Sequence, residues 1–115
     1  MSVEDLVQRF TGFAEQRDGA LLDNNIVAAN RLFDRIDEIA NELKSRPGDQ
    51  RTALIKLYGH PHMHVRLHAA KNTLAVAPQA ARQQLEQIYE SGWMPDAGDA
   101  GMCLWTLDEG IFKPT

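Results

Sequence analysis

Apolar residues recur at steps of three and four along most of the chain, a pattern that predicts amphipathic α-helices. The clearest case covers residues 25–45, where an apolar stripe faces away from an acidic side. The stripe consists of Ile26, Ala29, Leu32, Phe33, Ile36, Ile39, Ala40 and Leu43. The same periodicity predicts a preceding helix over residues 3–22, with Ser2 as its N-cap and Asp5 closing a capping box.

Glycine and proline divide the remaining sequence into four shorter helices. We expect these helices over residues 49–58, 63–76, 78–91 and 97–109. Pro78 suits the first turn of its helix, and Gly92 suits the C-terminal cap that follows. No segment shows the alternation of a strand. The sequence therefore predicts an all-α fold of about six helices in antiparallel hairpins, forming one domain over residues 1–115.

Charge is distributed unevenly along the chain. Residues 44–82 contain seven bases and one acid, residues 1–43 nine acids and four bases, and residues 83–115 six acids and one base. This distribution has two interpretations: neighbouring elements attract one another, or the middle third presents a basic face to an anionic partner. We favour the first, because segregation of exposed charge is common in folded proteins.

Composition narrows the class of protein. No apolar run approaches the roughly 18 residues of a membrane span, so we expect no membrane partner. The first residues lack the basic and apolar regions of a signal peptide, and Cys103 is the only cysteine, so we expect a cytoplasmic protein. A net charge of −4 argues against a dedicated nucleic-acid binder.

Residues 51–92 carry a recognisable repeat pattern. Leu54 and Leu57 precede the turn Gly59-His60-Pro61, after which come Val65-Arg66, Ala69-Ala70 and Leu74. This spacing resembles a HEAT repeat, although an aspartate usually stands where this chain has His60. The resemblance implies a HEAT-like or ARM-like right-handed superhelix whose inner helices line a concave binding side.

Two further segments suggest a family for the whole chain. They are Arg46-Pro47-Gly48-Asp49-Gln50-Arg51 and Asp96-Ala97-Gly98-Asp99-Ala100-Gly101. With them the chain is similar to a small bacterial family of unknown function, DUF2019. That resemblance implies no activity.

The helix predicted over residues 63–76 supplies the candidate binding face. Its apolar positions cover an arc of roughly 200°, so the helix must pack between neighbours. The remaining narrow face carries His64, His68, Lys71 and Asn72, which we take as the binding face. Arg66 lies inside the apolar arc, and we interpret it as a structural residue held by carboxylates or carbonyls.

The histidines are also weak candidates for a metal site. His64 and His68 are four residues apart on a helix, and His60 or His62 could add a third nitrogen. No glutamate belongs to the pattern and no supporting carboxylate is evident, so we predict no bound metal and no cofactor.

The other reactive or aromatic residues favour structural interpretations. Acids opposite the apolar stripe of residues 25–45 indicate a solvated face; they are Asp34, Asp37, Glu38 and Glu42. Cys103 stands between Met102 and Leu104, which favours a buried inert thiol. Trp93 and Trp105 are either core anchors or exposed residues of an interface, and we expect them to anchor the core. No catalytic constellation emerges, so we predict that the protein is not an enzyme.

The sequence therefore favours a protein–protein interaction module that binds another protein or itself. The alternative is a nucleic-acid-binding module that uses the basic region, with contacts from Arg46, Arg51, Lys56, Lys71 and Arg82. A metal protein centred on the four histidines is a third hypothesis.

Overall fold

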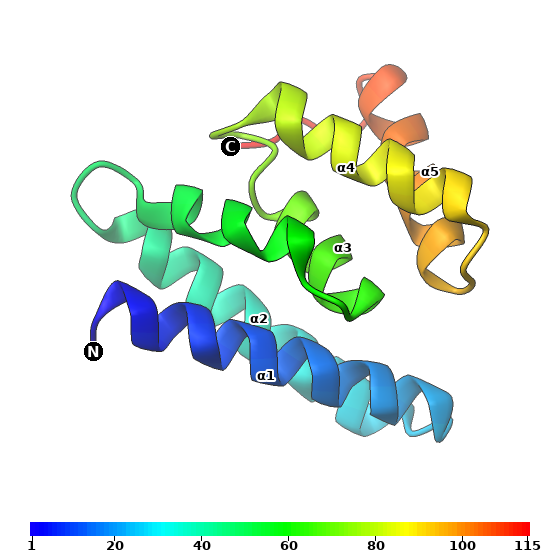
Figure 1. The fold of residues 1–115 in the computed structure, drawn as a ribbon, viewed down its shortest axis with the longest axis horizontal. Helices are drawn as coiled ribbons and strands as arrows, with labels where there is room; N and C mark the ends of the chain where they lie inside the picture. The colour runs from blue at the N-terminus through cyan, green and yellow to red at the C-terminus, as the bar shows by residue number, and fades with distance from the viewer. The chain divides into compact units, whose positions relative to one another are not determined.

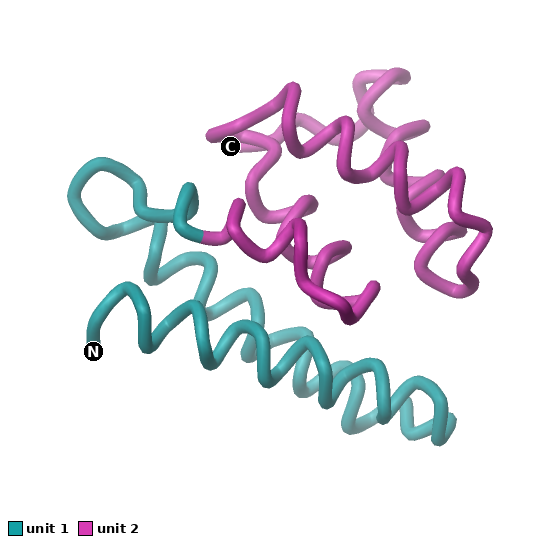
Figure 2. Tube along the Cα trace, viewed as in Figure 1, with its two compact units in different colours: residues 1–53 teal, residues 54–115 magenta.

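The computed structural model describes residues 1–115 and is entirely helical (Figure 1). Its elements are α1 (Val3–Leu22), α2 (Ile26–Ser45), the 3₁₀-helix η1 (Gln50–Gly59), α3 (Met63–Lys71), α4 (Pro78–Ser91) and α5 (Asp96–Asp108). The predicted all-α class and the number of six helices are confirmed. The chain forms two compact units, Met1–Ala53 and Leu54–Thr115, with η1 crossing from the first to the second (Figure 2).

Unit 1 is the antiparallel hairpin of α1 and α2, which pack along their length (Figure 1). The predicted capping box is present: the Asp5 amide donates to Ser2 Oγ at 3.0 Å, and the Ser2 amide donates to Asp5 Oδ2 at 3.2 Å. Asn25 caps α2 with a single bond, in which the Ala28 amide donates to Asn25 Oδ1 at 3.1 Å. The buried residues of unit 1 are all apolar: Leu6, Val7, Phe10, Ala14, Ala29, Ile36, Ile39, Ala40 and Leu43.

Two positions of the predicted α2 stripe are exposed. Ile26 and Phe33 keep 52% and 43% of their surface. Both lie at the edge of the arc that runs through the buried positions of α2, so α1 does not cover them. Instead, the Arg17 guanidinium lies over the Phe33 ring, 5.3 Å from its centroid.

The helix predicted over residues 49–58 is a 3₁₀-helix rather than an α-helix. Leu54 and Leu57 are both buried, and their three-residue spacing matches the three-residue turn of this helix. Asp49 precedes the helix with a positive φ of 53°. Its carboxylate accepts from Arg51 Nε at 2.9 Å and from a terminal guanidinium nitrogen at 2.7 Å.

α3 ends at Lys71, five residues before the predicted end at residue 76. Side chains compete there for the carbonyls of the last turn. The Asn72 amide donates to the His68 carbonyl at 2.8 Å, and the Thr73 hydroxyl donates to the Ala69 carbonyl at 2.8 Å. Pro78 then disfavours helical backbone at the preceding residue, so residues 72–77 form turns.

Unit 2 packs α3, α4 and α5 around one core. Its buried cluster contains Leu67, Ala70, Leu74, Ala81, Leu85, Ile88, Ala100 and Cys103. α4 has the predicted bounds, with Pro78 in its first turn and Gly92 as a left-handed cap with φ of 68°. No helix in either unit combines the length and apolarity needed to cross a membrane.

Candidate functional site

The residues of the predicted binding face do not share one open surface. His64 and His68 are buried, each with 2% of its surface exposed, whereas Lys71 and Asn72 are half-buried. Lys71 Nζ donates to Asp99 Oδ1 of α5 at 3.0 Å. The Asn72 side-chain amide donates to the His68 carbonyl at the end of α3. The role of these four residues in binding a partner stays a prediction.

Instead, the two histidines belong to a buried polar chain in unit 2. His64 Nδ1 lies 2.7 Å from Asp96 Oδ1, and His64 Nε2 lies 3.1 Å from His68 Nε2. Asp96 is the first residue of α5 and is also 2% exposed. Because a carboxylate oxygen accepts, His64 donates to Asp96 through Nδ1–H, and its Nε2 can accept the Nε2–H of His68. The chain thereby ties α3 to the start of α5.

Asp96 overturns the expectation that no carboxylate supports the histidines. A histidine that donates Nδ1–H to a carboxylate has its Nε2 lone pair oriented, as in many metal-ligand histidines. However, no three of the four histidines bring their ring nitrogens within 4.8 Å of one another. His60 Nδ1 accepts from the His62 amide at 3.0 Å, so this pair organises the turn before α3.

Most of the basic residues that the sequence suggested as nucleic-acid contacts are paired with nearby acids. In unit 2, Arg82 contacts Asp108 at 2.9 Å and Glu86 at 3.7 Å. Arg66 donates from Nε to the His60 carbonyl, in keeping with a structural role. The other pairs are Arg46–Glu42, Arg51–Asp49 and Lys71–Asp99. Two of these pairs, Lys71–Asp99 and Arg82–Asp108, join different helices and favour the interpretation that neighbouring elements attract one another.

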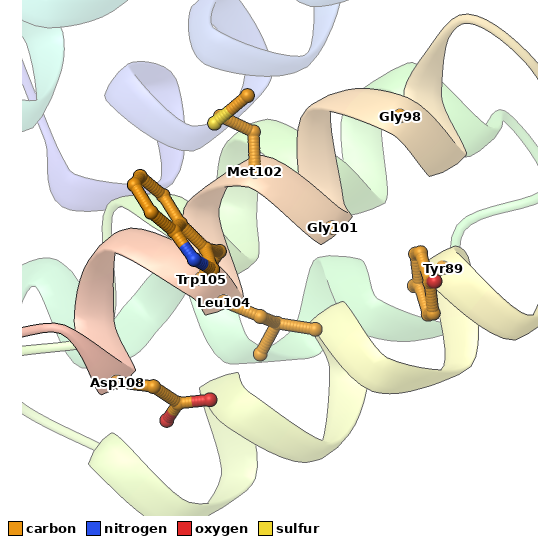
Figure 3. A pocket seen from close by; sticks show the side chains of 7 residues that line it. All are labelled: Tyr89, Gly98, Gly101, Met102, Leu104, Trp105 and Asp108. Atoms are coloured by element: carbon orange, nitrogen blue, oxygen red, sulfur yellow. The ribbon is translucent and has the colours of Figure 1, made fainter.

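A pocket of about 590 Å³ lies on the surface of α4 and α5 (Figure 3). We call it the α4–α5 groove. Its lining consists of Tyr89, Gly98, Gly101, Met102, Leu104, Trp105 and Asp108. Apart from Asp108 and the tyrosine hydroxyl, the side chains are apolar or aromatic, a composition typical of binding sites.

Gly101 shapes the groove by allowing α4 to approach α5 closely. A Cβ at this position would lie 2.7 Å from two ring carbons of Tyr89, closer than real side chains pack. Tyr89 therefore lies directly against the backbone of α5 (Figure 3). Leu104 points from α5 toward α4, whereas Met102 and Trp105 project from the other side of α5 (Figure 3).

Comparison with known proteins identifies the family. Residues 4–108 match the family described as a domain of unknown function, DUF2019. The chain belongs to this family. It is also similar to a solved structure entitled "Crystal Structure of the Protein RPA1889 from Rhodopseudomonas palustris CGA009", with 58% identity and a TM-score of 0.98. The match covers 100% of this chain and 95% of the other. No curated protein matches significantly.

The predicted DUF2019 membership is thus confirmed, and the family description assigns no activity. In this protein, α5 carries apolar residues on two sides. Its small residues Ala97, Ala100 and Cys103 are buried, which leaves the large side chains facing outward. Cys103 is buried as predicted, and burial raises the pKa of its thiol.

The expectation that both tryptophans anchor the core is wrong for this DUF2019 protein. Trp105 keeps 53% of its surface, Met102 60% and Trp93 65%. The sequence offered a signal for this exposure, because alanines at positions 97 and 100 mark the face of α5 that approaches its neighbours. Met102 and Trp105 are three residues apart and lie on a different face.

Proposed function

We propose that this DUF2019 protein is a non-catalytic protein–protein interaction module whose contact surface is the α4–α5 groove. The observation that carries the proposal is the grouping of three large exposed side chains, Tyr89, Met102 and Trp105, along one pocket. Contiguous apolar surface is unfavourable in water, at about 25 cal/mol per Å². A partner that covers these side chains would recover that free energy, and tryptophan and tyrosine are the residues that most often dominate interfaces.

The groove offers little support for catalysis. Its one carboxylate, Asp108, is paired with Arg82, and no histidine, cysteine or lysine lines it. An acid–base mechanism needs a proton-transferring group within reach of a bound substrate. His64 and Asp96 form such a pair, but both are buried and neither lines the groove.

Site-specific photo-crosslinking tests the interaction. A benzophenone amino acid replaces Met102 of the groove, and a second variant carries it at Asp37, an exposed position of α2. The proposal expects a discrete protein adduct from position 102 in native-host cells, and its loss when Trp105→Ala is added. Equal labelling from both positions, or no adduct from position 102, would contradict the proposal.

The HEAT-like superhelix remains part of the proposal. Its support is the buried Leu54 and Leu57 before the turn and the buried Ala69-Ala70 pair after it. We also retain a cytoplasmic location as an expectation. Nucleic-acid binding is the weaker alternative, because Arg51, Lys71 and Arg82 are engaged by acids.

Metal binding is a second candidate function, favoured by one observation. His64 and His68 bring their Nε2 atoms within 3.1 Å, and Asp96 orients the first of these rings. Elemental analysis of protein purified without a tag tests it. Stoichiometric zinc or nickel that falls in His68→Ala would support a site, and metal-free wild type that takes up no added zinc would exclude one.

A further inference from the structure

The α4–α5 groove lies in one of the two acidic parts of the chain. Residues 83–115 contain six acids and a single base, Lys113. Glu86 stands one turn before Tyr89 on α4, and Glu109 stands one turn after Trp105 at the end of α5. Glu90 and Glu109 are exposed. Glu86, Asp99 and Asp108 are paired with Arg82 or Lys71, and Asp96 is buried. The negative charge near the apolar floor therefore comes from Glu90, next to Tyr89 on α4, and from Glu109 at the end of α5.

The geometry limits how a polypeptide could bind there. The chain has no strand, so no sheet edge is available for a partner to extend. The floor is formed by side chains of two helices, with Leu104 and Tyr89 between them and Trp105 outside (Figure 3). An amphipathic helix fits such a surface, because its side chains at three- and four-residue steps fill a row of apolar contacts.

We infer that the partner of the α4–α5 groove presents a cationic amphipathic helix. This inference rests on the proposed function and adds the chemistry of the partner. Leucine-type anchors of the incoming helix would contact Leu104 and Trp105, and lysines or arginines beside them would face Glu109 and Glu90. Met102 supplies an unbranched, polarizable side chain that adapts to different apolar anchors.

The complementary charges select between possible partners. Acids near an apolar groove attract a cationic helix and repel an acidic one, which sets specificity and the association rate more than the final affinity. Asp108 is already paired with Arg82. The unpaired exposed acids beside the groove should therefore give the larger share of the discrimination.

A defined set of synthetic peptides tests the inference. The probe is an 18-residue peptide with leucine at helical spacing and lysine elsewhere. Matched peptides carry glutamate for lysine, or the same leucines and lysines in scrambled order. The protein is the full chain with Trp93→Phe, which leaves Trp105 as its only tryptophan. We expect the ordered leucine–lysine peptide to shift Trp105 emission to the blue, with a Kd at least ten-fold below that of either control.

Two charge reversals locate the binding site. Glu109→Lys should weaken binding of the leucine–lysine peptide several-fold, whereas Asp37→Lys on α2 changes net charge equally and should leave binding unchanged. Equal effects of the two variants would overturn the inference, because attraction would then come from overall charge. Equal binding of the glutamate or scrambled peptide would overturn it as well.

The remaining outcomes separate this inference from the proposed function. If no peptide shifts Trp105 while Met102 still crosslinks to a protein in cells, the cationic helix is wrong and the interaction surface stands. If Trp105 emission shifts with protein concentration alone, a second copy of the chain occupies the groove and the inference is overturned. Absence of both the peptide shift and the crosslink would reject the groove itself.

Discussion

The two units of this protein are both small helical bundles, yet they differ in the residues that they bury. In unit 1 every buried side chain is apolar, and the outward face of α2 carries Asp34, Asp37, Glu38 and Glu42. Unit 2 buries His64, His68 and Asp96, and its α5 exposes Met102 and Trp105. In its interior unit 1 follows the usual rule for stability, whereas unit 2 departs from it. On the surface both units expose large apolar side chains, such as Leu22 and Val27 in unit 1, and those of unit 2 include the ones that line the α4–α5 groove. Such departures are expected where a protein binds something.

The largest effect should come from the apolar interior of unit 1. Phe10 is fully buried, so Phe10→Ala should lower the free energy of unfolding by about 3–5 kcal/mol. Phe33→Ala is the matched control, because Phe33 is the same residue type with 43% of its surface exposed. Urea unfolding followed by circular dichroism measures both. Equal losses would show that burial does not separate the two positions.

The buried polar chain of unit 2 should give the next largest effect. Asp96→Ala removes the acceptor of His64 Nδ1 and leaves a buried donor, at a cost of about 1–3 kcal/mol. Asp96→Asn should cost less, because its amide oxygen can still accept from the ring. Asp99→Ala, which removes a half-exposed partner of Lys71, should change stability by about 0–1 kcal/mol. A larger loss for Asp99→Ala than for Asp96→Ala would refute this ranking.

A smaller effect should appear at the capping box of α1. Ser2→Ala should cost about 1 kcal/mol, the usual value for losing an N-cap. Hydrogen bonds from Ser2 hold the pKa of Asp5 below its ordinary value of 3.8. The stabilisation by ionised Asp5 is therefore present above 3.8 and is lost as the pH falls through the lower native pKa. Urea unfolding of wild type and Asp5→Asn should converge in acid, and a difference that grew in acid would reverse the sign.

Sequence reasoning located the helices where the local signals were strong. Ser2 and Gly92 occupy the caps that their residue types predicted. The errors lie where side chains compete with the backbone, as Asn72 and Thr73 do at the end of α3. Periodicity gives the faces of a helix but not the depth to which each face is covered, which is why Phe33 was misplaced.

The candidate site was harder to predict, because it depends on contacts distant in sequence. His64 and Asp96 are 32 residues apart, and nothing in the local pattern pairs them. The close approach of Tyr89 to Gly101 likewise joins two helices. The charge pairs were anticipated only in general terms, as attraction between basic and acidic segments.

The central claim is that the outer face of α5 is apolar for binding rather than for folding. The most direct test is the free energy of unfolding of the Met102→Ala/Trp105→Ala double variant beside that of Leu85→Ala, which removes a fully buried side chain of α4. We expect the double variant to stay within about 0.5 kcal/mol of wild type. Leu85→Ala should lose about 2–5 kcal/mol. A loss in the double variant as large as that of Leu85→Ala would show that Met102 and Trp105 serve the fold, and would contradict the claim.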